Sequence, residues 1–275
     1  MVGKFFRKFT CGALVLVLVF VNASVSQAGA GGTSVVQVQG AIASVPELLA
    51  DSDEVSSGGN SRSVALTSVN GTQVDIPKDA GSGVRITTKN EAGSPVGLKV
   101  NLPGANAAGV GKATAPGVVA FPSATVSANA VQADENGGVR FFQVLNGPTA
   151  PEEFQYTLEL PQGSSIVKEV NGSLTVHTSD GDFIVPTPWA RDADGRMVWA
   201  QYFTDGESTI DLVVNHHGED LAYPVTADPV WLTPWIVAQI IRCGAGALLG
   251  WISSGGWDWW WRALAVAGGC LIGMR

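Results

Sequence analysis

Short alternating runs of apolar and polar residues fill the chain from residue 63 to residue 214, and turn-forming dipeptides separate several of them. A period of two is typical of strands that bury one face, and Asn70-Gly71, Asn171-Gly172 and Asp194-Gly195 favour tight turns. No helical period of useful length appears between residues 63 and 230. The regular spacing of the runs predicts a mainly β protein built from sandwich-like antiparallel sheets.

The predicted strands form two groups, one on each side of Asn136-Gly137-Gly138. The first group is Ser63–Val69, Gln73–Ile76, Val84–Thr88, Gly97–Leu102 and Ala124–Ala133. The second group is Val139–Leu145, Phe154–Leu160, Ser165–Val170, Ser173–Thr178, Asp182–Pro186, Val198–Phe203 and Thr209–Val214. We therefore expect a first β region over residues 63–135 and a second, sandwich-like β region over residues 136–230.

The first 28 residues have the parts of a secretory signal peptide. This segment opens with three positive side chains, continues with the apolar run Cys11–Val21 and ends in the small residues of Ser26-Gln27-Ala28. The apolar run is shorter than the roughly 20 residues of a membrane span. We predict a signal peptide over residues 1–28, cleavage near Ala28, and a mature protein that is secreted or held in the cell envelope.

Residues 29–62 are rich in Gly, Ser and Ala and carry a small acidic run with weak periodicity. Such composition predicts a flexible or partly ordered lead-in to the strands. Charge then divides the mature chain. Residues 29–231 carry 23 acidic and 10 basic side chains, a net charge of −13, whereas residues 232–275, the tail, have a net charge of +2. The acidic body disfavours nucleic acid as a partner, because phosphate binding needs a basic surface.

The tail is nearly uncharged and holds six of the nine tryptophans. Thr233-Pro234 is typical of a helix start, and Asp258 can cap a second helix that runs towards Met274. At 1.5 Å per residue each helix would span roughly 24–27 Å, close to the apolar thickness of a bilayer. We expect an apolar, Trp-rich helical hairpin over residues 231–275 that turns near residue 255.

Two G-x-x-x-G patterns in the tail predict close helix packing. Their glycines are Gly246, Gly250, Gly269 and Gly273. Cys243 and Cys270 remain after export, and an even pair in an oxidising compartment predicts one disulfide, with two buried free thiols as the alternative. The hairpin turn places Cys243 opposite about residue 267, within a helical turn of Cys270.

Indole rings favour the membrane–water interface, where an apolar ring and a polar N–H are both accommodated. The tail therefore predicts contact with a lipid membrane. The residues expected to make this contact are Trp235, Trp251, Trp257, Trp259, Trp260, Trp261, Arg242 and Arg262. Two alternatives remain open: the hairpin packs against the β body as an ordinary subdomain, or it mediates self-association.

The body offers few candidates for chemistry. His216-His217 follows a predicted strand, and adjacent side chains point in opposite directions where the backbone is extended. Asp192-Ala193-Asp194-Gly195 resembles the opening of a calcium loop, but no glutamate follows at the required spacing, so a turn with exposed aspartates is expected. The catalytic and nucleotide-binding motifs with known spacing are absent from the sequence. We predict neither an enzyme nor a cofactor or metal site.

Five phrases of the body carry a family resemblance. They are Val74-Asp75-Ile76-Pro77, Gly83-Val84-Arg85-Ile86, Leu158-Glu159-Leu160-Pro161-Gln162-Gly163, Pro188-Trp189-Ala190-Arg191-Asp192-Ala193-Asp194-Gly195 and Ala222-Tyr223-Pro224-Val225-Thr226-Ala227-Asp228-Pro229. On these phrases residues 64–231 resemble a group of uncharacterised secreted actinobacterial proteins, whose β-rich region ends in this last signature before a variable C-terminal segment. The resemblance implies secretion and a carrier-like body, and it brings no catalytic residues to transfer.

These observations give three functional hypotheses. The first is a secreted precursor or carrier whose acidic β body accompanies a membrane-active, bacteriocin-like hairpin. The second is a cell-surface β domain held by the hairpin as a membrane anchor. The third is a secreted binding module of unknown ligand, in which the tail completes the fold.

Overall fold

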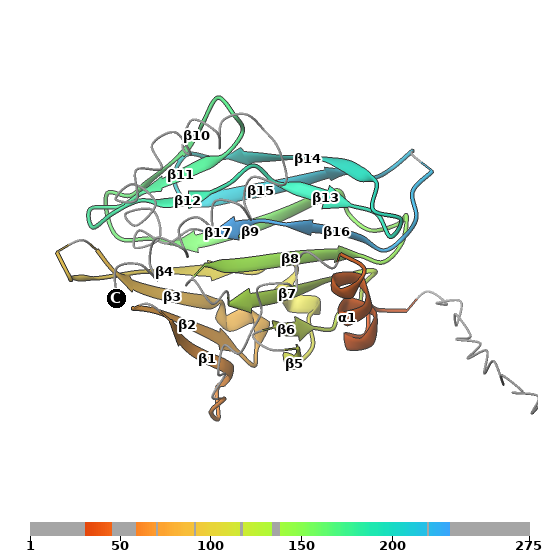
Figure 1. Cartoon of the computed structure of the whole chain (residues 1–275), viewed down its shortest axis with the longest axis horizontal. Helices are drawn as coiled ribbons and strands as arrows, with labels where there is room; N and C mark the ends of the chain where they lie inside the picture. The colour runs from red at the N-terminus through yellow and green to blue at the C-terminus, as the bar shows by residue number, and fades with distance from the viewer. Residues whose placement is uncertain are drawn as a thin grey trace, which may run out of the picture. The chain divides into compact units, whose positions relative to one another are not determined.

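The computed structural model describes residues 31–45, 59–69, 71–90, 92–115, 118–133, 138–218 and 220–231. Within these ranges strands dominate and every pair of neighbouring strands is antiparallel, so the prediction of a mainly β, antiparallel protein is confirmed (Figure 1). The predicted signal peptide and helical hairpin lie outside the described residues, except that Trp231 belongs to the last strand.

The strands agree closely with the sequence pattern at several places, since β1 and β8 have the predicted bounds. The strands are β1 (Ser63–Val69), β2 (Thr72–Pro77), β3 (Val84–Lys89), β4 (Pro95–Asn101), β5 (Lys112–Ala115), β6 (Val118–Phe121), β7 (Ser127–Ala133), β8 (Val139–Leu145), β9 (Glu153–Glu159), β10 (Ser165–Lys168), β11 (Leu174–His177), β12 (Phe183–Val185), β13 (Trp189–Arg191), β14 (Met197–Thr204), β15 (Thr209–Asn215), β16 (Val225–Asp228) and β17 (Val230–Trp231). Between the described strands lie two short 3₁₀ helices, η2 (Ala80–Ser82) and η3 (Ala105–Ala107).

Fourteen strands form one continuous sheet, and β10, β11 and β12 form a separate three-stranded sheet. The order in the large sheet is β1-β2-β3-β4-β9-β15-β14-β13-β16-β8-β7-β6-β5, with β17 also paired to β8. The sheet nearly closes, because the N–H of Gly111, just before β5, donates to the carbonyl of Lys78, just after β2, at 2.8 Å. The arrangement thus differs from separate sheets packed face to face. It also joins the two predicted β regions, since β4 pairs with β9 and β7 with β8.

One half of the large sheet has a buried inner face and a polar outer face. Strand β9 alternates along its whole length, with Phe154, Tyr156 and Leu158 buried and the residues between them exposed. The buried side chains join the main core, which also contains Val74 and Ile76 of β2 and their neighbours on β3 and β4. This half, β1-β2-β3-β4-β9-β15, is called the open half below, because its outer face carries polar side chains.

The other half, β5-β6-β7-β8-β16, is buried on both faces along β6, β7, β8 and β16, whereas β5 is a partly exposed edge strand. In β8 Phe141 and Leu145 face the main core, whereas Phe142 and Val144 face a second cluster that includes Val38 of helix α1 (Val35–Ala43). Every described residue of β8 is buried for this reason. We call this region the covered half, since α1 packs on its outer face (Figure 1).

Helix α1 lies within the stretch for which a flexible or partly ordered lead-in is expected, and residues 34–44 are an ordered part of it. Ser34 caps the helix: its hydroxyl accepts from the N–H of Gln37, and the Gln37 side chain accepts from the N–H of Ser34. This reciprocal capping satisfies two backbone donors at the helix start. Burial of Val38, Ala41 and Ile42 against the sheet then provides the apolar contact that a nine-residue helix needs for stability.

Candidate functional site

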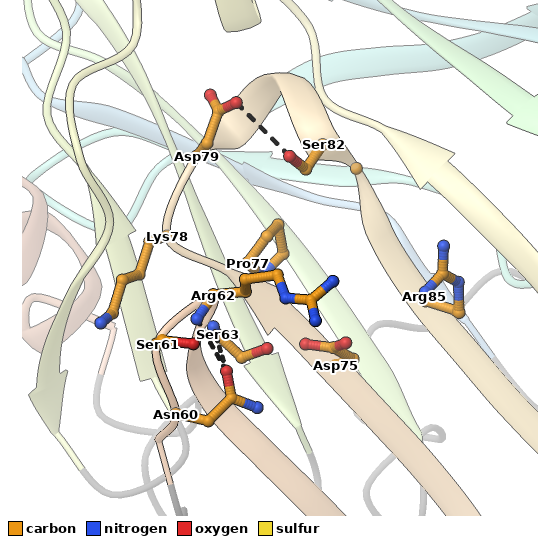
Figure 2. A pocket seen from close by; sticks show the side chains of 11 residues that line it. Asn60, Ser61, Arg62, Ser63, Asp75, Pro77, Lys78, Asp79, Ser82 and Arg85 are labelled. Atoms are coloured by element: carbon orange, nitrogen blue, oxygen red, sulfur yellow. Dashed lines mark hydrogen bonds between the residues drawn. The ribbon is translucent and has the colours of Figure 1, made fainter.

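A polar cavity of about 570 Å³ opens on the outer face of the open half, beside β1, β2, η2 and the start of β3 (Figure 2). Its size falls in the range typical of small-molecule sites. The lining residues are charged, hydroxylic or small: Asn60, Ser61, Arg62, Ser63, Asp75, Pro77, Lys78, Asp79, Ser82, Gly83 and Arg85. Three of the ten cationic side chains of the acidic body therefore gather at one place.

Hydrogen bonds hold the backbone around this cavity. The Asn60 side-chain oxygen accepts from the N–H groups of Arg62 and Ser63 at 2.8 and 2.9 Å, which forms a tight turn ahead of β1. The Lys78 N–H donates to the Arg62 carbonyl at 2.8 Å. These bonds fix the positions from which Arg62 and Lys78 extend their side chains.

Asp79 has a structural role at the top of the cavity. Its carboxylate accepts from the N–H of Gly81 at 3.1 Å and from the Ser82 hydroxyl at 3.4 Å, so it caps η2. In Figure 2 this carboxylate points towards Ser82 and away from the other acidic side chain of the cavity. Asp79 is thus engaged in shaping the rim.

Asp75 is the acidic side chain at the floor, and strand register explains its place. Asp75 of β2 is the direct partner of Arg85 of β3, and both occupy outward positions between buried neighbours. In Figure 2 the Asp75 carboxylate lies between Arg62 and Arg85. Its Oδ1 atom is buried and receives no hydrogen bond from the residues that the structure describes. A buried carboxylate oxygen without a donor is costly, and such atoms are uncommon.

Gly83 allows the chain to pass close to β4 at this point. Its φ of 69° lies in the left-handed region, and a Cβ there would approach the Asn101 side-chain oxygen to 2.5 Å. Only glycine meets both demands without strain. The close passage brings Gly83, which lines the cavity, against the side chains of Lys99 and Asn101 on β4.

The row of charges continues across the open half. Arg85 is the direct partner of Lys99 on β4, and Lys99 is the partner of Glu159 on β9, with which it forms a salt bridge. The hydrogen bond from Lys99 holds the pKa of the Glu159 carboxyl below its usual value, and the positive charges of Lys99 and Arg85 lower it further. Four strands thus present Asp75, Arg85, Lys99 and Glu159 side by side. Such a row offers charged hydrogen-bonding groups on the outer face of the sheet.

A second polar cluster surrounds His216, which is buried after β15. Its Nε2–H donates to the Pro151 carbonyl at 3.2 Å, and its Nδ1 lies 2.8 Å from the Tyr223 hydroxyl. Burial lowers the pKa of the His216 imidazole, which favours the neutral ring. The His217 ring lies 4.3 Å from that of His216 and its Nε2 bonds to Ala150, so the two rings lie against one segment instead of pointing in opposite directions. Both histidines therefore tie loops together.

The two longest phrases of the family resemblance meet in space. Trp189, Ala190 and Arg191 of β13 pair with Asp228, Ala227 and Thr226 of β16. Asp192 is buried and accepts from the N–H groups of Asp194, Arg196 and Ala222 and from the Arg196 side chain, which joins the two phrases further. The expectation of exposed aspartates is thus wrong for Asp192, because the carboxylate organises its own loop. β13 also pairs with β14, so this contact links the two halves of the sheet.

Asp228 is a buried acid within this junction. It accepts from the Trp189 side chain and lies near Arg140 of β8, yet burial raises its pKa to about 7. Its charge and their own burial raise the pKa values of Tyr156 and Tyr202. The hydroxyls of both tyrosines and one Asp228 oxygen make no hydrogen bond with described residues. The buried oxygens of this cluster lower the stability of the fold. The cluster lies next to the last strand.

All site residues predicted from the sequence fall in the tail, outside the described residues. These are the disulfide pair Cys243 and Cys270, the packing glycines, and the tryptophans and arginines expected at the membrane. In the described ranges no helix has the length and hydropathy that crossing a bilayer requires. The same ranges hold no group of three His, Cys, Asp or Glu side chains close enough to bind a metal ion.

The cavity was not predicted from the sequence, although part of its signal is visible there. Asp75 and Arg85 interrupt apolar runs at alternate positions, and the Asn70-Gly71 turn fixes the hairpin of β1 and β2. The bulge between Ser63 and Ala65, which sets where Arg62 lies, has no comparable sequence signature. When the chain was compared with known protein families and with curated proteins, no match was found in either comparison.

Proposed function

We propose that this protein is an exported carrier whose acidic β body accompanies a membrane-active, bacteriocin-like helical hairpin in the tail. The observation that carries the proposal is the division of charge and hydropathy: a body with a net charge of −13 precedes a cationic tail that holds six tryptophans. A polar, negatively charged body favours solubility of the whole chain, whereas an apolar tail rich in indoles favours lipid.

The end of the described body supports this division. Trp231 is 1 % exposed, its ring lies 6.0 Å from that of Phe141, and its strand pairs with β8. The last strand before the tail is therefore fixed in the sheet. A fixed attachment point suits a body that accompanies the segment after it. The resemblance to secreted actinobacterial proteins with variable C-terminal segments supports the same separation between a carrier body and an active tail.

Mass spectrometry of culture supernatant and cell envelope tests the proposal. A carrier predicts tail peptides from residues 232–275, oxidised at Cys243 and Cys270, in the supernatant or separated from the body. Full-length protein found in membranes alone would contradict the carrier role and favour a permanent anchor. A soluble monomer that never engages lipid would contradict both.

A second function, an exported binding module, is favoured by the cavity on the open half. Three cationic side chains, Arg62, Lys78 and Arg85, lie around it in a body that is otherwise strongly acidic. Anions are the ligands that such a site would concentrate. Calorimetric titration of the mature protein with small anions tests this function, and the absence of binding by any anion would contradict it.

A further inference from the structure

We propose that the cavity beside β1, β2 and β3 binds a small anion that carries a hydrogen-bond donor next to its negative group. A carboxylate or phosphate beside a hydroxyl meets this description. The inference rests on the binding-module function and specifies its ligand.

The cationic side chains determine the first feature expected of the ligand, its negative group. Arg62 and Arg85 both line the cavity, and in Figure 2 their guanidinium groups lie on either side of the Asp75 carboxylate. In the same view the Lys78 side chain extends away from both arginines. Guanidinium groups present several N–H donors in one plane and match the oxygens of carboxylates and phosphates. The negative group is therefore expected at the two arginines.

Asp75 determines the second feature expected of the ligand, its hydrogen-bond donor. Its buried Oδ1 atom has no hydrogen-bond donor among the described residues, and the carboxylate forms no salt bridge of 4.0 Å or less with either arginine. A simple anion would meet repulsion from this carboxylate. An anion with a neighbouring hydroxyl would instead donate a charge-assisted hydrogen bond to it. Asp75 thus favours ligands that combine both features over anions without a donor.

The surrounding backbone is held in place without the ligand. The Asn60 turn, the bond from the Lys78 N–H to the Arg62 carbonyl, and the Asp79 cap of η2 together fix the segments on both sides. Gly83 holds the start of β3 against β4. Binding therefore needs ordering of only two or three long side chains, a modest cost for a small ligand.

Calorimetric titration of the mature protein with matched probes tests the inference. The probes are glycerol phosphate against methyl phosphate, both at about pH 8, where a phosphate monoester carries no P–OH, and glucuronate against acetate. We expect the member with a hydroxyl to bind about tenfold or more tightly in at least one pair. Asp75→Ala is expected to strengthen binding of the plain anion, because a like charge is removed, and to bring the ratio close to one.

The double variant Arg62→Gln/Arg85→Gln is expected to weaken every probe by about tenfold or more. Lys89→Gln is the matched control, since Lys89 is an exposed cation of β3 that does not line the cavity. Equal affinities within both probe pairs would overturn the inference and leave the binding function standing. Absence of binding by all four probes would overturn both. An equal loss from the control variant would also overturn the inference, because it would indicate a general charge effect.

Discussion

The covered half and the open half use the same antiparallel pairing but treat their outer faces differently. In the covered half Phe142 and Val144 lie under helix α1, so the strands are buried on both sides. In the open half the residues between the buried positions of β9 are exposed, and charged side chains cross four strands in a row. The comparison shows that both halves bury an inner face in the main core, whereas only the covered half also buries its outer face.

Two carboxylates show the same contrast. Asp228 of the covered half is buried, and its pKa is raised to about 7. Glu159 of the open half is exposed, and the hydrogen bond from Lys99 keeps its pKa below the usual value. The first carboxyl favours its neutral form through loss of water, and the second favours its charged form through a partner.

The largest expected effect comes from the covered half. Phe142→Ala should lower the free energy of unfolding by about 3–5 kcal/mol, because a fully buried ring between sheet and helix is lost. Thr157→Ala, at an exposed position of β9, is the control and should change stability by about 0.5 kcal/mol or less. Urea unfolding measures both. Similar losses in the two variants would contradict the burial of Phe142 between the sheet and α1.

Asp228 should make stability depend on pH. Its folded pKa of about 7 exceeds its ordinary value of 3.8, so the folded chain binds this proton more tightly than the unfolded chain. The stability that comes from this proton is fully present below about pH 4. It is lost as the pH rises to about 7, and the free energy of unfolding then falls by at most about 4 kcal/mol. In Asp228→Asn this loss should disappear, whereas Glu153→Gln on the open half should keep it. The free energy of unfolding, measured from pH 4 to 8, tests this prediction. Parallel pH profiles for wild type and Asp228→Asn would refute the assignment of the pH dependence to Asp228.

The helix cap should have an intermediate effect. Ser34→Ala removes one partner of the reciprocal bonds with Gln37, and we expect a loss of about 1 kcal/mol. Ser34→Asp retains a capping oxygen and should lose less. Thermal unfolding compares the two variants. If the alanine variant equalled wild type, the cap would not contribute to holding α1 over the covered half.

The smallest effect should come from the exposed salt bridge of the open half. Lys99→Met should change stability by about 0.5 kcal/mol or less, since surface ion pairs contribute little. The same substitution should nevertheless raise the pKa of Glu159 towards its usual value, which a carboxyl chemical-shift titration measures. Lys89→Met serves as the control. An unchanged Glu159 titration in Lys99→Met would argue against the charge row.

The open half and the long strands β7 and β8 of the covered half were largely predictable from the sequence, whereas the short covered strands and helix α1 were not. β9 alternates clearly, so its range follows from the period of two. β5, β6 and β16 are only four residues long, and β6 and β16 are buried throughout, which leaves too short a pattern to separate from a loop. Helix α1 is rich in valine, which favours strands, and its conformation depends on the Ser34 cap and on contact with the sheet. That contact is a tertiary effect.

The candidate site was predictable only in part, for a related reason. The outward positions of Asp75 and Arg85 follow from alternation, but their meeting with Arg62 depends on the bulge in β1 and on the passage allowed by Gly83. For the tail the sequence remains the basis of the predictions, since residues 232–275 lie outside the described structure. The proposed functions therefore separate cleanly: one concerns the tail, the other the open half.

Flotation of the oxidised mature protein with anionic phospholipid vesicles tests the carrier proposal most directly, with a chain that stops after Trp231 as the control. The account predicts that the mature protein floats with the vesicles and shows blue-shifted tryptophan emission, while the shortened chain stays in the aqueous fraction. Mature protein that remains entirely in the aqueous fraction, with the same emission with and without lipid, would contradict it.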